Sequence, residues 1–155
     1  MDAACPPDFT RLVPSGDDYA GQPVGSAFTW LAIATPDQSG EWYLVAFRST
    51  RRAGADETQL QQLDDLAHDE ASRSPGFVHY FKGPANQRGE CLSFCLWDSR
   101  REARAAAGRP DHARAAAIVH ETYDSYTLEF QRVRKRRGAP GFEFEAYDRP
   151  TARPD

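Results

Sequence analysis

Hydrophobic and polar residues alternate along several short segments, which is the pattern of half-buried β-strands. The clearest of these segments are residues 41–50, 76–83, 90–97 and 126–135. An apolar, β-rich segment at 26–35 precedes the turn cluster PDQSG, so it predicts a hairpin with the strand at 41–50. The segment FEFEAY at 142–147 adds a candidate edge strand.

Residues 55–72 instead repeat their hydrophobic positions at helical spacing. These positions are Leu60, Leu63, Leu66, Ala67 and Ala71. Residues three and four apart share one side of a helix, so the segment predicts one amphipathic helix. Asp56 or Glu57 favours its N-terminus, because the helix dipole attracts negative charge there.

A second helical region follows the strand at 90–97. Ser99 is a favoured N-cap residue, so the alanine-rich segment 99–107 predicts a helix. Gly108 interrupts it, and Pro110 suits the first turn of a further helix that extends to about Asp124.

This order of elements predicts an α+β protein with the ferredoxin-like βαββαβ arrangement and a four-stranded antiparallel sheet. An extra N-terminal strand at 26–35 would precede it. Residues 26–137 would form a single domain. Residues 1–25 contain four prolines and no periodicity and predict a flexible extension, and 138–155 would be a C-terminal tail.

The predicted sheet is apolar on both faces. In the strand 41–50, Trp42, Leu44 and Ala46 alternate with Tyr43, Val45 and Phe47. A sheet of this kind must be covered on both sides. Helices cover one face, and a second copy of the chain would be the simplest cover for the other, which predicts a homodimer.

Composition narrows the function classes. The 155 residues are 40% hydrophobic and 27% charged, as in a globular domain. The net charge of −4 disfavours nucleic-acid binding as the main role. No apolar window is long enough to cross a membrane. The start MDAACPPDF lacks a basic and apolar leader, so we expect a cytoplasmic protein.

Cys91 and Cys95 lie on one predicted strand, four residues apart. Four residues of strand span about 13 Å, whereas a disulfide needs Cα atoms within about 7 Å. The two sulfur atoms therefore neither form a disulfide nor act as neighbouring ligands of one metal ion. We expect them to fill one face of the sheet as small residues.

Several short motifs resemble those of a known family. They consist of Pro75, Gly76, Phe77, Trp97, Ser99, Pro110 and His112. Over residues 41–135, this pattern resembles the dimeric α/β-barrel superfamily, and in particular its antibiotic-biosynthesis-monooxygenase-like domains. That family includes cofactor-independent oxygenases acting on aromatic polyketides, haem-degrading enzymes and isomerases, so the resemblance implies a small-molecule protein without fixing its reaction.

The haem-degrading members can be compared residue by residue. They carry a catalytic tryptophan nine positions after the position of Trp97 and an iron-ligating histidine ten positions further on. Those positions are Ala106 and Ala116 here, and alanine supports neither role. His112 lies one helical turn from the ligand position, so a shifted haem site stays open, but the expectation is that no cofactor is bound.

Two histidines are candidate catalytic bases. His79 alternates with Phe77 and Phe81 on one strand, where it would act as a base if that side lined a cavity, or be a core histidine if it did not. His112 is the histidine of the family pattern, and it could otherwise pack at the start of its helix. His68 and His120 are assigned to the surface.

Trp97 ends a strand face whose other members, Ser93 and Cys95, are small. Small residues leave space and a tryptophan supplies a flat wall, so these residues with Phe81 predict a pocket for a planar ligand. Arg48 could orient an anionic or phenolate substrate, and Tyr123 could donate a hydrogen bond to it. Each of these side chains also has an ordinary structural explanation, as a core or strand-end residue.

The sequence contains no nucleotide-binding, zinc-binding or hydrolase motif. Our leading prediction is a cofactor-independent, monooxygenase-like homodimer acting on a small aromatic or polyketide-like substrate in an apolar cavity. The alternatives are a barrel that binds a small hydrophobic ligand without chemistry, and a structural dimer filled by its own side chains.

Overall fold

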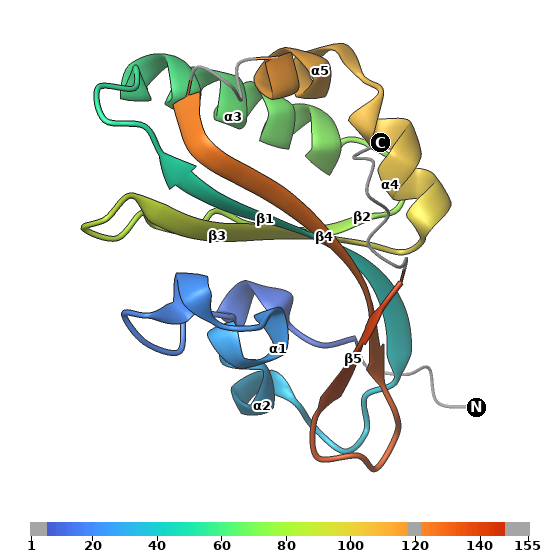
Figure 1. Ribbon diagram of the computed structural model, residues 1–155. Coiled ribbons are helices and arrows are strands. Elements are labelled where there is room, and N and C mark those ends of the chain that lie inside the picture. Colours follow the sequence, from blue (N-terminus) through green and yellow to red (C-terminus); the bar gives the residue numbers. More distant parts are fainter. Residues whose placement is uncertain (1–5, 118–121, 148–155) are drawn as a thin grey trace.

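A five-stranded antiparallel sheet lies between two layers of very different origin (Figure 1). The computed structural model describes residues 6–117 and 122–147. The strands are β1 (Gly40–Arg51), β2 (Phe77–Phe81), β3 (Glu90–Trp97), β4 (Tyr123–Lys135) and β5 (Phe142–Ala146). Their order across the sheet is β2-β3-β1-β4-β5, and β1 pairs with β3 on one side and β4 on the other. The ferredoxin-like α+β fold predicted from the sequence is confirmed.

Three helices cover one face of the sheet (Figure 1). They are α3 (Glu57–Ser72), α4 (Arg100–Ala107) and α5 (Pro110–Ala117). The side chain of Asp56 accepts a hydrogen bond from Gln59 N at 2.9 Å and starts α3, and that of Ser99 accepts one from Glu102 N at 3.3 Å and starts α4. Both helices therefore begin where capping residues predict.

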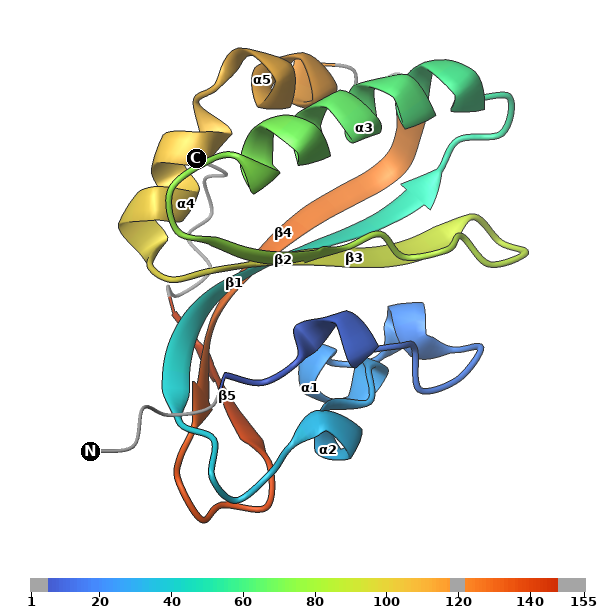
Figure 2. The same ribbon diagram turned by 180° about the vertical axis from the view of Figure 1, so that it is seen from behind.

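The other face is covered by the chain's own N-terminus (Figure 2). We call residues 6–39 the N-terminal layer. It contains four short turns of helix: η1 (Phe9–Arg11), η2 (Tyr19–Gly21), α1 (Val24–Ala27) and α2 (Trp30–Ile33). Its buried side chains are Phe9, Leu12, Tyr19, Val24, Ala27, Phe28, Trp30 and Ile33. They pack on the sheet side chains Leu44, Ala46, Leu92, Phe94, Leu96 and Val133 to form the larger core cluster.

Trp30 is central to this layer. It is 2% exposed, its indole N–H donates to the carbonyl oxygen of Val24 at 3.0 Å, and its ring lies 5.8 Å from that of Phe94 and 4.9 Å from that of Phe144. The tryptophan thereby links the N-terminal layer to the middle of the sheet and to its edge strand.

The N-terminal layer corrects two predictions. Residues 26–35 do not form a strand, because an apolar run can equally be a buried helical segment, and here it bends over the sheet as α1 and α2. Residues 6–25 are not a flexible extension, since Phe9, Leu12 and Tyr19 are buried. Their apolar residues are irregularly spaced among prolines, so periodicity does not reveal them.

The last predicted helix does not reach Asp124. Tyr123 and Asp124 belong to β4, in which Tyr123 pairs with Arg51 of β1, and α5 is described over Pro110–Ala117. Residues 118–121, including His120, lie outside the described residues. β5 forms at the sheet edge as FEFEAY predicts, by pairing with β4.

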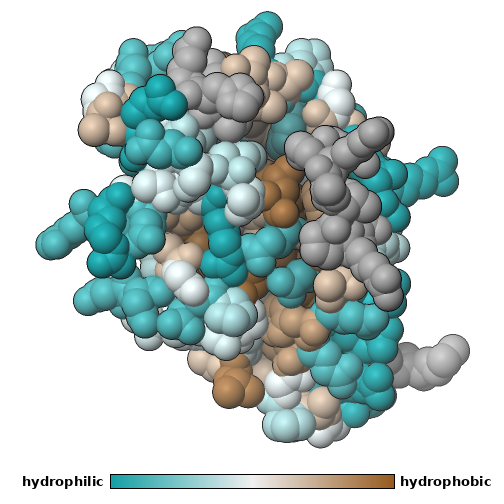
Figure 3. All heavy atoms as spheres, in the orientation of Figure 1, coloured by the Kyte–Doolittle hydropathy of each residue, from teal (hydrophilic) through white to brown (hydrophobic). Residues whose placement is uncertain are grey.

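The argument for a homodimer depended on an uncovered apolar face, and the N-terminal layer covers that face. The surface seen in Figure 3 is mostly hydrophilic, and its hydrophobic side chains are confined to a narrow central strip and an isolated spot at the lower edge. Across the described residues, no helix has the length and apolar character needed to cross a membrane.

Trp30→Ala should lower the free energy of unfolding by about 3–5 kcal/mol, the usual cost of removing a buried aromatic ring. The adjacent Leu31 is 75% exposed, so Leu31→Ala should change stability by less than about 0.5 kcal/mol. Urea unfolding of the two variants measures both values. Equal effects would mean that the N-terminal layer does not contribute to the core.

Sedimentation equilibrium should give the mass of a monomer, 17.3 kDa, because the apolar face that would recruit a second copy is already buried. The mass should not rise across a hundredfold range of protein concentration. A dimer mass would show that another surface mediates association.

Candidate functional site

A cavity of about 140 Å³ lies between the sheet and helices α3 and α5. Its floor is made by Phe47, Ser49 and Arg51 of β1, Tyr80 of β2, Cys91, Ser93, Cys95 and Trp97 of β3, and Tyr123 and Tyr126 of β4. Its roof is made by Leu60, Asp64, Ala67, His68 and Ala71 of α3, and by His112, Ala115 and Ala116 of α5. The cavity is thus lined by residues of four strands and two helices, between Phe47 and Tyr126.

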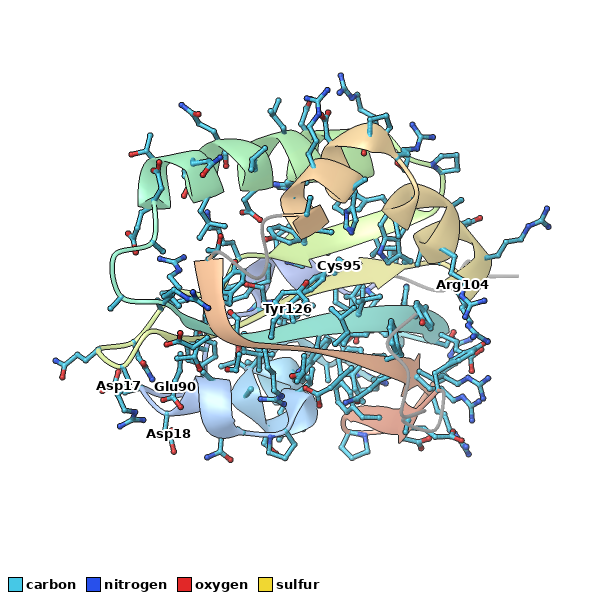
Figure 4. The ribbon with its side chains drawn as sticks, turned by 45° about the horizontal axis from the view of Figure 1, so that its top comes forward. Asp17, Asp18, Glu90, Cys95, Arg104 and Tyr126 are labelled. Carbon is cyan, nitrogen blue, oxygen red and sulfur yellow. The ribbon has the colours of Figure 1, made fainter. Side chains whose placement is uncertain are left out.

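Space remains between the floor and the helices because β3 presents small side chains there. Cys91, Ser93 and Cys95 are each less than a tenth exposed, and they lie on the same side as Trp97, as the strand alternation predicts. Of these predicted pocket residues, Ser93, Cys95 and Trp97 all line the cavity. Figure 4 labels Cys95 and Tyr126, which lie between the sheet and the helical layer.

The cysteines of this floor are free thiols, as their separation along the strand predicts. Trp97 donates its indole N–H to the sulfur of Cys95 at 3.1 Å. Burial raises the pKa of Cys95 to about 12. Cys95 is therefore protonated at neutral pH and is a packing residue rather than a nucleophile.

Tyr80 links the floor to the roof. Its hydroxyl donates to Asp64 Oδ1 at 3.0 Å, and Lys82 Nζ lies 3.1 Å from Asp64 Oδ2. Burial, with the adjacent Asp64 carboxylate as a second cause, raises the pKa of Tyr80 well above its ordinary value. The hydroxyl thus stays protonated, and its proton is held by Asp64.

His68 packs on this tyrosine, with ring centroids 4.7 Å apart. It is exposed, as its polar helix neighbours predict, and it also lines the cavity wall. Only the position of Tyr80 on the facing strand could have indicated this role.

His112 enters the cavity from the first turn of α5. The carboxylate of Glu70 on α3 accepts hydrogen bonds from the backbone N–H groups of Asp111 and His112, both at 3.2 Å, and thereby fixes the start of α5 against α3. Burial lowers the pKa of the His112 imidazole, and the nearby Glu70 only partly opposes this shift. His112 is therefore predominantly neutral near pH 7, as a general base must be.

Tyr123 and Tyr126 complete the floor beside Arg51. Burial raises the pKa of both phenols. Their rings lie 5.5 Å apart. Both hydroxyls are therefore hydrogen-bond donors at neutral pH.

Three predicted site residues lie on the wrong face of the sheet. His79, Phe81 and Arg48 all face the N-terminal layer. Phe81 stacks on Phe94 at 5.7 Å, and the ring of His79 lies 6.1 Å from the same phenylalanine. They contribute to the core and not to the cavity.

A bulge in β2 explains why His79 faces the N-terminal layer. Phe77 pairs with Trp97, but His79 pairs with Leu96, so β2 contains one more residue than β3 at this point. Phe77 consequently points toward the helices and His79 points away from them. Burial lowers the pKa of His79, so it is a neutral core histidine.

Arg48 follows the alternation of β1 and therefore also points toward the N-terminal layer. It forms an ion pair with Glu129 of β4 and donates to the carbonyl oxygen of Ala20 at 2.9 Å. Its charge is satisfied there, so it cannot orient a ligand in the cavity.

The residues present do not fit haem in the manner of the haem-degrading relatives. Ala116, at the position of their iron ligand, does line the cavity, while Ala106 is a buried residue of α4. Within residues 6–117 and 122–147, no cluster of three or more histidine, cysteine or carboxylate side chains could hold a metal ion.

A family model described as PB2B2.08-like matches residues 5–146 of this chain. The UPF0643 protein PB2B2.08 of Schizosaccharomyces pombe is 27% identical over 109 residues, which are 66% of this chain and 50% of that protein. This chain therefore spans about half the length of the curated relative that it matches.

Two solved structures share the fold. Rv0793 from Mycobacterium tuberculosis is 21% identical, with a TM-score of 0.51 over 57% of this chain and 91% of its own. SO0527 from Shewanella oneidensis is 11% identical, with a TM-score of 0.53 over 62% of this chain and 94% of its own. Both likenesses agree with the fold predicted from the sequence, and identities this low show the fold alone.

The unfolding free energy should decrease as the pH falls below about 6.5, the ordinary pKa of histidine. Because burial lowers the pKa of His112 in the folded state, the unfolded chain binds this proton more readily, and acid favours unfolding. His112→Gln should lose less stability between about pH 7.5 and 5.5 than the unsubstituted protein does. Urea unfolding at both pH values tests this.

Part of the pH dependence should remain in His112→Gln, because burial also lowers the pKa of His79. His79→Gln should therefore give a similar partial reduction, and the double variant a larger one. Identical pH profiles for all four proteins would contradict the assignment of two buried neutral histidines.

Proposed function

The chain belongs to the PB2B2.08-like family, and we propose that it is a cofactor-independent, monooxygenase-like enzyme acting on a single-ring aromatic compound. The observation that carries this proposal is the placement of a neutral His112 in a cavity whose wall also contains tryptophan, tyrosine, alanine and cysteine side chains. Such a cavity combines an apolar binding surface with a group able to accept a proton.

The size of the cavity limits the substrate. A cavity of about 150 Å³ in another protein holds one benzene ring, and this one measures about 140 Å³. A single substituted ring is therefore the favoured ligand, whereas the fused rings of an aromatic polyketide are too large. This narrows the substrate class expected from the sequence.

The proposed reaction uses the electrons of the substrate itself. His112 accepts the proton of a phenolic hydroxyl, and the resulting phenolate carries the electron density that reacts with dioxygen. One oxygen atom becomes a carbonyl on the ring, and the other leaves as water, so a phenol and O₂ give a quinone and H₂O. The ring supplies all four electrons, and no external reductant is required.

The surrounding side chains support this chemistry by position. Trp97 forms a flat wall, and Cys95 is held as a thiol beside it. Tyr80 is a second polar group on the cavity wall, with its own proton held by Asp64. His112, which burial keeps neutral, is the group that we assign to take up the proton.

Resorcinol and phenol are suitable probes, since each has one ring. In the unsubstituted protein we expect heat of binding by calorimetry, and oxygen uptake in step with quinone absorbance. His112→Gln should lower the turnover number by about 10²- to 10⁴-fold, the usual contribution of a general base. Ala67→Leu should fill the cavity from α3 and abolish binding.

Ala105→Leu is the matched control for the cavity-filling variant, because Ala105 is exposed on α4. It should bind and turn over the probes normally. Binding without oxygen uptake would instead support a non-catalytic ligand-binding protein. If the unsubstituted protein binds no single-ring phenol, the proposed function is wrong.

A further inference from the structure

Arg51 brings a guanidinium group to the wall of the cavity. It is the last residue of β1, and its side chain is 21% exposed. Its Nη1 pairs with Glu57 Oε1 at 3.2 Å, on the outer side of the domain, where the Glu57 side chain is 69% exposed. Arg51 therefore borders the cavity on one side and pairs with Glu57 on the other.

The other cation of the cavity wall is already neutralised. Lys82 Nζ lies 3.1 Å from Asp64 Oδ2 and donates to Gln61 Oε1 at 2.5 Å. Among the described residues of the cavity wall, Asp64 is also the only carboxylate. Arg51 is therefore the cation of this wall whose ion-pair partner lies outside the cavity.

The surroundings of Arg51 favour an oxygen-rich ligand. Ser49, Tyr123 and Tyr126 lie on the floor at the same end of the cavity, because Arg51 pairs with Tyr123 and Ser49 pairs with Tyr126 in the sheet. Burial keeps both phenols protonated. The end of the cavity near Arg51 thus offers a cation and several hydroxyl groups, while Trp97 and His112 belong to the other end.

We infer that the cavity takes a single-ring aromatic carboxylate, with the carboxylate against Arg51 and the ring toward Trp97. The inference rests on the proposed function and adds the charge and the orientation of the substrate. A guanidinium is planar and pairs well with a carboxylate. A carboxylate on the cavity side of Arg51 would share the charge of the guanidinium with Glu57 on the outer side.

Calorimetry with 3-hydroxybenzoate and 3-hydroxybenzamide tests the charge directly, because the two molecules have almost the same shape. In the unsubstituted protein the carboxylate should bind at least about tenfold more tightly, a difference of about 1.4 kcal/mol. Raising the salt concentration should weaken the binding of 3-hydroxybenzoate and leave the binding of 3-hydroxybenzamide unchanged.

Arg51→Met should remove this preference by weakening only the binding of 3-hydroxybenzoate. Arg52→Met is the matched control, since Arg52 is 53% exposed and pairs with Asp124 outside the cavity; it should keep the preference. Glu57→Gln provides a second variant that does not alter the buried side chain. It should strengthen carboxylate binding, because the competing carboxylate is gone. Thermal unfolding confirms that each variant is folded.

Equal binding of the acid and the amide, or a preference that survives Arg51→Met in a folded variant, would overturn this inference and leave the proposed function standing. If neither compound nor resorcinol binds the unsubstituted protein, the proposed function itself fails. The two failures are therefore distinguishable.

Discussion

A sheet with two apolar faces must be covered on both sides, and this requirement organises the whole molecule. The alternating residues of β1 and β3 are hydrophobic or small in both sets, so neither face can be left in water. Helices α3 to α5 cover one face and the N-terminal layer covers the other. The two covers differ in packing. The N-terminal layer packs aromatic rings on large side chains, whereas on the helical side β3 presents the small residues Cys91, Ser93 and Cys95. These small side chains leave the space of the cavity beneath α3 and α5.

Alternation along a strand shows which residues share a face, and it did so correctly for β1 and β3. It does not show which of the two faces borders a cavity. Ser93, Cys95 and Trp97 were therefore grouped correctly, while Arg48 and Phe81 were assigned to a cavity that lies on the other side. His79 illustrates a second limit, because one extra residue in β2 separates it from Phe77. A bulge depends on the pairing partner and is not visible in a single strand.

The polar groups of the site come from segments that no local pattern connects. Asp64 and Tyr80 are 16 residues apart, and Arg48 and Glu129 on the opposite face are 81 apart. His112 was predicted because a family motif contains it, whereas His68 was expected only at the surface and Arg51 was not singled out. Their roles arise only when α3 lies across the sheet. The N-terminal layer was missed for a related reason, since its apolar residues follow the shape of the sheet and no fixed period.

The position of Trp30 against Phe142 and Phe144 has a consequence for how the chain folds. These rings belong to the first and last parts of the core, and they are 5.4 Å and 4.9 Å apart. Contacts between such distant segments require closure of a very long loop, which slows folding. During synthesis, the N-terminal layer leaves the ribosome long before its partners on β4 and β5. Its aromatic residues must then stay soluble without their sheet, and the sparse, proline-interrupted spacing that hides them from pattern analysis also makes them poor seeds for β-aggregation.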